Sequence, residues 1–297
     1  MQVIGYVFVD VKGFSRVPYV ATGTNIGDVV ISHGGICRNV AENLALLGEP
    51  SSFVSMVDDS ALGRDVITRL QAVGVDVSRV TACPNGMGYW LALLDETGAL
   101  VGSVSRQPDP AALTGLIARE ADAIAAEDMV LEIDTTAEIA QTLLDAAERS
   151  GRKVYCNVSN MAVILAHPEM LSRLSAFICN DIEAGKLFGE NLSALSCEAM
   201  LSQRERRSAE RGIARMIVTM GSRGCVYVDH VSGERGIHPA EKIHVVDSTG
   251  AGDAFLSAAV LALSRGRTIG EAAEVGTRAA AATLQSLEST IPKGFRL

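Results

Sequence analysis

Short apolar runs alternate with longer amphipathic segments along most of this 297-residue sequence. The apolar runs that we interpret as buried strands cover residues 3–9, 52–57, 129–133, 153–157, 176–179 and 216–220. Helical periodicity fills residues 61–73, 137–150 and 197–212, and it also follows Gly35, where the apolar residues share one helical face. Because strands that alternate with helices favour a parallel sheet covered on both faces, we predict an α/β fold with a doubly wound, mostly parallel sheet.

Two stretches interrupt this alternation. Residues 12–32 are polar and rich in turn residues, and their last residues form an extended segment. Residues 89–94 and 100–105 have the pattern of two strands joined by a hairpin turn. Such segments pair poorly within a doubly wound sheet. We therefore predict a small β lid, formed by residues of about 11–32 and 86–107, on a single domain that spans residues 1–297.

The overall composition limits the classes of partner. A formal net charge of −9 argues against a nucleic-acid-binding surface, which needs clustered basic residues. No apolar run approaches the ~20 residues that span a bilayer, and we expect no secretory leader, because no charged and apolar leader pattern stands before the first predicted strand. The six cysteines are scattered without a Cys-x-x-Cys pair, which is typical of free thiols in a reducing compartment. We expect a cytoplasmic protein that binds neither nucleic acid nor membrane.

The most informative segment covers residues 245–255 and reads Val-Val-Asp-Ser-Thr-Gly-Ala-Gly-Asp-Ala-Phe. We expect a short apolar strand at its first two residues, then a small-residue loop and a helix. Gly250, Ala251 and Gly252 would let successive N–H groups at the helix N-terminus bind an anion such as a phosphoryl group. Asp253 beside this site could accept the proton of an attacking alcohol as a general base. The alternative is that Asp253 only caps the helix.

Residues 247–253, Asp-Ser-Thr-Gly-Ala-Gly-Asp, closely resemble the C-terminal signature of the ribokinase/PfkB carbohydrate and nucleoside kinases. The resemblance extends over nearly the whole chain, because further motifs of that family follow in the right order: Gly5 with Asp10, Gly34-Gly35 with Asn39, Asn180 with Glu183, and Thr219 with Gly221 and Gly224. It implies an ATP-dependent phosphotransferase that acts on an alcohol. Asp253 would be its base, and residues 250–252 would form its anion-binding turn.

The resemblance also implies which residues bind the acceptor. Asp10 would hold a sugar diol, and Gly34, Gly35 and Asn39 would hold the acceptor's hydroxyls. Alternatively, Asp10 is a plain strand-end residue and the two glycines merely open a helix. Further candidates for acceptor binding are Arg38, Glu132 and Asp247. His33, next to the double glycine, is interpreted as a loop packing residue.

A second group of residues is expected at the nucleotide. By resemblance, its members are Asn180, Thr219, Gly221, Gly224 and Thr249. Glu183 would organise Mg²⁺ through water, although an acid in the first turn of a helix is also favoured by the helix dipole alone. The expected cofactors are ATP and Mg²⁺, and a role for a monovalent cation such as K⁺ stays open.

Two positions depart from the family pattern. Ile36 stands where many of the sugar kinases have a lysine, with Arg38 two residues further on, so one phosphate-contacting charge has moved or been lost. Residues 277–283 lack the asparagine that is usual in the adenine pocket.

A separate expectation concerns assembly: Tyr89, Leu91 and Leu93 would expose an apolar face on the lid, which favours a homodimer joined lid to lid.

The acceptor itself is less constrained than the reaction. The first half of the chain is most similar to pseudouridine kinases in residues 10–15, 34–48 and 89–95, and above all at Arg38-Asn39. We therefore expect phosphorylation of a ribosyl 5′-hydroxyl, with pseudouridine as the first choice of acceptor. Residues 104–107 lack the Asn-Asp-Met type of sequence that would hold a uracil-like base. Another nucleoside, or a free sugar of the ribose, fructose or sugar-acid type, stays open.

Two other classes of protein fit less well. A Rossmann oxidoreductase would need a Gly-x-Gly-x-x-Gly turn after the first strand, where this chain has Asp10-Val11-Lys12. A non-catalytic sugar-binding regulator would be expected to lose Asp253 or the glycines around it, and all of them are present. The regulator is therefore only a remote alternative.

Overall fold

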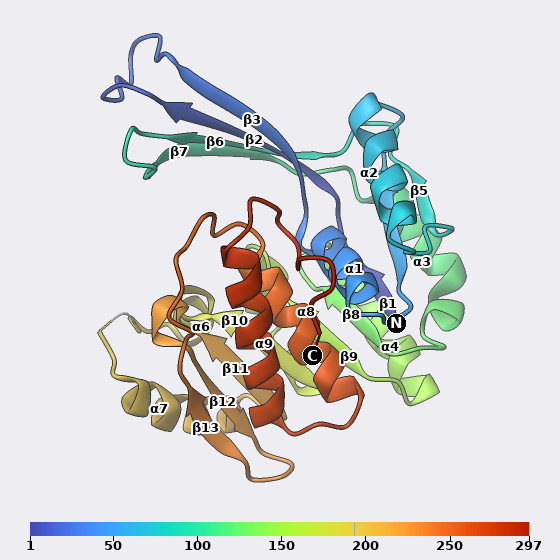
Figure 1. Ribbon diagram of the computed structural model, residues 1–297. Coiled ribbons are helices and arrows are strands. Elements are labelled where there is room, and N and C mark those ends of the chain that lie inside the picture. The colour runs from blue at the N-terminus through green and yellow to red at the C-terminus, as the bar shows by residue number, and fades with distance from the viewer. Residues whose placement is uncertain (193, 297) are drawn as a thin grey trace.

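The structure is a computed structural model that describes residues 1–192 and 194–296. Within these residues the main element is a nine-stranded sheet in the order β13-β12-β11-β10-β9-β8-β1-β4-β5 (Figure 1). Its strands are β1 (Gln2–Ile4), β4 (Ser52–Val57), β5 (Val80–Ala82), β8 (Met129–Glu132), β9 (Val154–Asn157), β10 (Ala176–Asn180), β11 (Arg215–Thr219), β12 (Cys225–Asp229) and β13 (Arg235–His238). Neighbouring strands from β11 to β5 are parallel, and β12 and β13 add an antiparallel edge. The predicted mostly parallel sheet is confirmed.

Helices cover both faces of this sheet. Side chains alternate along each strand, so that Val3 packs into one core and Ile4 into the other. The core that contains Val3 is covered by α1 (Ile36–Leu46), α2 (Ala61–Ala72), α8 (Ala251–Ser264) and α9 (Ile269–Leu284). The opposite core is covered by α3 (Ala111–Ile124), α4 (Ala137–Ser150), α5 (Ala162–Ala166), the 3₁₀ helix η1 (Pro168–Arg173), α6 (Asp181–Phe188) and α7 (Cys197–Glu210). The fold is therefore doubly wound, as the sequence predicts.

A second, four-stranded sheet has the order β3-β2-β6-β7, and we refer to it as the small sheet. It consists of β2 (Phe8–Ser15), β3 (Gly27–Gly34), β6 (Gly88–Leu94) and β7 (Leu100–Arg106). Strand β2 is antiparallel to β3 and parallel to β6, and β6 and β7 form a hairpin. Figure 1 shows the small sheet projecting from the rest of the molecule. Its role as a lid stays a prediction.

The two faces of the small sheet differ in chemistry. Strand register places an apolar row across one face, formed by Ile31, Val11, Leu91 and Val104. Ile31, Leu91 and Val104 in this row are exposed. Asp10, Lys12 and Phe14 alternate with Val11 along β2, so their side chains leave the sheet on the other face.

Two expectations about strands are wrong. Residues 3–9 do not form one strand, because the chain leaves the main sheet after Ile4 and enters the small sheet at Phe8. Asp10 consequently lies in the small sheet. Val245 and Val246 do not form a strand either, since both lie in an irregular, exposed segment before α8.

Two further observations concern the chain as a whole. The six cysteines are free, and all except Cys197 are buried. None of the helices in the described ranges combines the length and the apolar character needed to cross a membrane.

Candidate active site

Helix α8 begins at a turn that requires glycine. Gly250 has a φ of 79° at the cap position, and a Cβ there would overlap the carbonyl oxygen of Ser289. Ala251, Gly252 and Asp253 form the first helical turn, in which the N–H groups have no acceptor within the helix. A Cβ on Gly252 would meet open space, so this turn leaves room for an anion beside those N–H groups.

Asp253 lies against Asn39, although 214 residues separate them in the sequence. Asn39 Nδ2 donates a hydrogen bond to Asp253 Oδ2 at 2.5 Å and so joins α1 to α8. Asp253 keeps part of its surface exposed, but protein atoms surround much of its carboxyl group. The resulting desolvation raises the pKa of Asp253 to about 7, although the Asn39 hydrogen bond opposes the rise. A carboxyl group whose pKa lies near neutrality is well matched to general-base catalysis.

Asp10 and the double glycine meet where β2 pairs with β3. A Cβ on Gly34 would overlap the Asp10 carboxyl group, so this close approach requires glycine. Gly35 then caps α1, and Asn39 follows one helical turn later. Burial raises the pKa of Asp10. The structure thus brings Asp10, Gly34, Gly35 and Asn39 together, and their contact with an acceptor stays a prediction.

Arg38 is buried, with 1% of its surface exposed. Its guanidinium group donates to Glu42, to the carbonyl oxygen of His33 at 2.8 Å and to Ser289 Oγ at 3.3 Å. Glu42 also accepts a hydrogen bond from Arg69. Because these partners occupy most of the guanidinium group, Arg38 holds α1 against the segment around Ser289.

Glu132 is buried at the carboxyl end of β8. Its Oε2 atom accepts a hydrogen bond from the backbone N–H of Tyr6 at 3.0 Å, within the crossing between the two sheets. Burial raises the pKa of Glu132 to about 7, and this backbone hydrogen bond opposes the rise. Glu132 therefore supports the crossing that leads to Asp10, whereas its contact with substrate stays a prediction.

The loop before α8 contacts the small sheet through Lys12. Lys12 Nζ donates to Thr249 Oγ1 at 2.7 Å, and Asp247 Oδ1 accepts from the Thr249 N–H at 2.8 Å. Although burial acts in the opposite direction, the hydrogen bonds from Thr249 and the charge of Lys12 lower the pKa of Asp247. Sequence reasoning missed Lys12, because its contact joins segments 237 residues apart. Its position two residues after Asp10 could have indicated it, because residues two apart on a strand share a face.

Two of the candidate nucleotide-binding residues end adjacent parallel strands. Asn180 at the end of β10 pairs in register with Thr219 at the end of β11. Asn180 Oδ1 accepts from the Glu183 N–H, and Glu183 Oε2 accepts from the Asn180 N–H, both at 2.8 Å. Glu183 therefore has the helix-start role that we weighed as an alternative. Whether it also organises Mg²⁺ stays a prediction.

The glycine turn after β11 contains Gly221, Gly224 and the 3₁₀ helix η2 (Gly221–Arg223). Arg223 Nη2 lies 2.9 Å from Asp181 Oδ2, and so ties this turn to the start of α6. The turn, Asn180 and Thr219 consequently lie along one edge of the main sheet, where parallel α/β sheets bind ligands.

A cleft of about 610 Å³ lies between the small sheet and the helices of the main domain. Its lining includes Lys12, Phe14, Val30, Ser32 and His33 from the small sheet, Asp65 and Arg69 from α2, and Asp247, Thr249 and Ser289 from the segments around α8 and α9. His33, expected in a loop, lies near the end of β3, with its Nε2 atom 3.0 Å from Asp65 Oδ2. The volume suits a small molecule.

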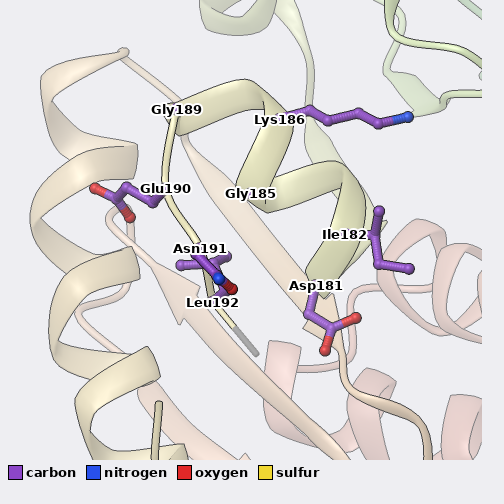
Figure 2. Close-up of a pocket in the computed structure, with 8 residues that line it drawn as sticks. All are labelled: Asp181, Ile182, Gly185, Lys186, Gly189, Glu190, Asn191 and Leu192. Carbon is purple, nitrogen blue, oxygen red and sulfur yellow. The ribbon is translucent and has the colours of Figure 1, made fainter. Parts of the chain in front are cut away.

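Figure 2 shows a second, more open cavity of about 430 Å³ along α6. Lys186 and Asp181 lie at opposite ends of this helix. Asp181 pairs with Arg223, and Glu190 pairs with Arg204 and Arg207. These acidic groups hold α6 and the segment that follows it against their neighbours. The candidate active site is therefore the cleft that Lys12, Asp247 and Thr249 line.

Comparison with known proteins agrees with this geometry. Residues 1–293 match the pfkB family carbohydrate kinases. The guanosine-inosine kinase of Exiguobacterium acetylicum is 35% identical over 297 residues, which cover 97% of this chain and 95% of that protein. The pseudouridine kinase of Escherichia coli (strain K12) is 28% identical over 258 residues, which cover 86% and 80%. The ribokinase of Arabidopsis thaliana, solved with ribose and ATP, has a TM-score of 0.80 at 21% identity and covers 98% and 95%.

The chain therefore belongs to the pfkB family of carbohydrate kinases. It is a phosphotransferase of the carbohydrate and nucleoside kinase class, which acts on a hydroxyl group. The family, the fold and the reaction class expected from the sequence are confirmed.

Proposed function

We propose that the protein transfers the terminal phosphoryl group of ATP to the 5′-hydroxyl of a ribonucleoside. The observation that carries this proposal is the 2.5 Å contact between Asn39 and Asp253, which joins the acceptor motif on α1 to the anion-binding turn of α8. A ribosyl group held by Asp10, Gly34-Gly35 and Asn39 would present its 5′-hydroxyl to Asp253. A carboxylate such as Asp10 can accept both hydroxyls of a diol as charge-assisted hydrogen bonds.

In the proposed reaction, Asp253 accepts the hydroxyl proton while the acceptor oxygen bonds to the γ-phosphorus of ATP. The bond from that phosphorus to the leaving oxygen of ADP breaks, and the proton stays on Asp253 until it passes to solvent. The N–H groups in the first turn of α8, which lack acceptors within the helix, would stabilise the charge that develops on the transferred group. With a pKa of about 7, Asp253 is available as a base near neutral pH.

We place the nucleotide along Asn180, Thr219, Gly221, Gly224 and Thr249. Mg²⁺ fits this region as an ion held mainly by phosphates and water, because it usually keeps several waters and takes one or two carboxylates. Glu183 uses Oε2 in its capping box, which leaves Oε1 for a metal-bound water. The described residues contain no group of three or more His, Cys, Asp and Glu side chains that could hold a metal by themselves. When bound, Mg²⁺ would neutralise phosphate charge.

Two classes of base are candidates for the acceptor. We place guanosine and inosine first, because the relative that acts on them is 35% identical over nearly the whole chain. Pseudouridine, the first choice from the sequence, becomes second. Its main support was the Arg38-Asn39 pair, but Arg38 is buried among Glu42, His33 and Ser289. Arg38 thus stabilises the site in a way that does not distinguish one base from another.

We further propose that residues 1–297 act as one domain, with the lid formed by residues of about 11–32 and 86–107. The exposed apolar row of Ile31, Leu91 and Val104 supports a homodimer joined through this face. Glu132 and Arg38 would support the acceptor site from behind, and Asp247 would face the acceptor from the cleft. The free, mostly buried cysteines support a cytoplasmic location.

Steady-state rates with guanosine, inosine, pseudouridine, adenosine, ribose and fructose test the proposal. A ribonucleoside should exceed both free sugars in kcat/KM by roughly tenfold or more, because a base adds binding contacts in the cleft. Phosphorus NMR of the product should show a 5′-monophosphate. If ribose or fructose exceeds every nucleoside, the nucleoside proposal is wrong, and the family assignment is unaffected.

A further inference from the structure

Lys12 connects the small sheet to the turn that starts α8. Its ammonium group donates to Thr249 Oγ1 at 2.7 Å, and Thr249 immediately precedes Gly250. Lys12 is partly buried and lines the cleft between the two parts of the molecule. A positive charge carried by the small sheet therefore lies beside the proposed anion-binding turn.

The other cations that line this cleft are already committed to carboxylates. Arg38 and Arg69 both pair with Glu42, and Arg69 also pairs with Glu288. Lys12 instead has a neutral hydroxyl as its hydrogen-bond partner. An ammonium group has three donors, so Lys12 can retain Thr249 and still donate to an incoming oxygen. Among the described cations of the cleft, Lys12 is thus the one best placed to meet a new anion.

The local charge balance gives this cation a function. The charge of Lys12 lies close enough to Asp10 and Asp247 to favour the ionised form of both. Asp247 lines the cleft, and Asp10 lies close enough to Asp253 to raise its pKa. A phosphoryl group transferred beside Asp253 would therefore meet a negatively charged environment. A nearby cation lowers the cost of bringing the negative phosphoryl group into this environment, and the effect is larger in a site shielded from water.

Resting on the proposed nucleoside kinase function, we propose that Lys12 is a catalytic residue that donates a hydrogen bond to the phosphoryl group during its transfer. Lys12 keeps its proton throughout, while the acceptor oxygen bonds to phosphorus, the bond to ADP breaks and Asp253 takes the acceptor's proton. Lys12 stabilises the negatively charged oxygens of the phosphoryl group during its transfer. It is not required for holding ADP alone.

This placement couples acceptor binding to catalysis. Asp10 and Lys12 are two residues apart on β2, so their side chains leave the same face of the small sheet. An acceptor bound by Asp10 would hold β2 in place, and β2 would in turn hold the Lys12 ammonium group beside Gly250. The strand that holds the acceptor then also completes the phosphoryl site, which would disfavour transfer to water when no acceptor is present.

The test compares Lys12→Met with Lys12→Arg and with Arg16→Met, using the nucleoside for which the wild-type enzyme is most active. Lys12→Met removes the charge and should lower kcat by about 10²- to 10³-fold, the usual effect of losing one donor to a developing anion. Lys12→Arg should recover activity to within about tenfold of wild type, because it restores a cationic donor. Arg16 lies just beyond β2 in an exposed pair with Asp28, so Arg16→Met should change kcat by less than about twofold.

A binding measurement separates catalysis from a merely structural latch. ADP with aluminium fluoride and nucleoside, which imitates the phosphoryl group in transfer, should bind Lys12→Met about 100-fold more weakly than wild type. Binding of ADP alone should be unchanged. If Lys12→Met keeps wild-type affinity for the aluminium fluoride complex, or keeps more than about a tenth of wild-type kcat, the proposal is wrong. A wild-type enzyme that phosphorylates no nucleoside would instead overturn the proposed function.

Discussion

The main sheet and the small sheet are built from similar strands but differ in what covers them. Strands β8 and β9 of the main sheet are buried at every residue, and helices pack on both faces. Strand β7 of the small sheet is exposed at every residue. Strand β2 lies between these extremes, with most of its residues partly exposed. Helices of the same chain therefore cover the apolar faces of the main sheet, whereas the apolar face of the small sheet stays exposed.

This difference indicates that the main sheet serves mainly stability, whereas the small sheet serves binding, catalysis or assembly. Residues that only fill the core, such as Leu131, contribute to stability wherever the acceptor is. The small sheet instead presents Asp10 and Lys12 on one face and apolar side chains on the other, so each face can meet something outside the sheet. We expect mutations in the main sheet to change the free energy of unfolding, and mutations in the small sheet to change binding, catalysis or assembly.

The largest expected effect lies where the two regions meet, at Asp253. Asp253→Asn removes the proposed base but keeps the shape of the side chain and an oxygen that can accept from Asn39. We expect kcat to fall by about 10²- to 10⁴-fold, the usual contribution of a general base. Calorimetric titration should show ATP and nucleoside binding within a few-fold of wild type. Retention of more than about a tenth of wild-type kcat would contradict the assignment.

A smaller effect is expected from the polar face of the small sheet. Asp10→Ala should lower kcat/KM for the nucleoside roughly 10- to 100-fold, because a hydrogen bond to a charged group contributes about 1.5–3 kcal/mol. The Kd of ATP should change little. Wild-type enzyme should discriminate against 2′-deoxynucleosides by a similar factor, and Asp10→Ala should lose most of this discrimination. Equal rates of wild type with ribo- and deoxyribonucleosides would remove the diol contact from the proposal.

Much of the fold and part of the site can be predicted from local patterns. Mainly apolar runs predict strands such as β4 and β8, because a strand buried on both faces is apolar along most of its length. The Gly250–Asp253 turn is recognisable because its proposed function depends on consecutive residues. Asn39 follows Gly35 by one helical turn, so its position near the acceptor motif is also local information.

Other features depend on contacts that no local pattern encodes. Val245 and Val246 are an apolar pair without a strand, since two residues cannot show whether a neighbouring strand exists to pair with them. Residues 3–9 are uniformly apolar, yet the chain changes sheet within them, where Glu132 binds the N–H of Tyr6. Lys12 acquires its position beside Thr249 only when the two regions fold together.

A third prediction compares the same substitution in the two sheets. Leu131 in β8 is 0% exposed and Leu91 in β6 is 42% exposed. Leu131→Ala should lower the free energy of unfolding by about 2–5 kcal/mol through lost burial and a residual cavity. For Leu91→Ala, the change within an isolated protomer should be within about 0.5 kcal/mol.

Urea denaturation at low and high protein concentration tests this contrast together with the proposed homodimer. The loss caused by Leu131→Ala should not depend on concentration. In a dimer joined through the small sheet, wild-type stability rises with protein concentration, and Leu91→Ala should reduce that rise. A monomeric mass of the wild type by light scattering at micromolar concentration would contradict the dimer and leave the comparison of the two leucines intact.

The smallest expected effect is on thermal stability, and it follows from the raised pKa of Asp253. Burial raises this pKa from 3.8 to about 7 in the folded protein. Between these values the folded state holds a proton that the unfolded state has released, so the free energy of unfolding falls as pH rises through this range. Above about pH 7, Asp253 is ionised in a crowded site, and the unfavourable contribution is complete. An asparagine at position 253 cannot ionise, so the Asp253→Asn variant lacks this unfavourable contribution to the free energy of unfolding.

Asp253→Asn should therefore raise Tm by roughly a few degrees at about pH 8, and the gain should disappear as the pH falls towards about 4. Glu132 also has a pKa raised to about 7, but it is present in both proteins and largely cancels in the comparison. Differential scanning calorimetry of the two proteins across this pH range measures the difference. A Tm difference that does not change with pH would show that Asp253 ionises as freely in the folded protein as in the unfolded chain. The Asp253 carboxyl group would then not be desolvated, and in this respect the α8 turn would resemble the exposed surface of the small sheet.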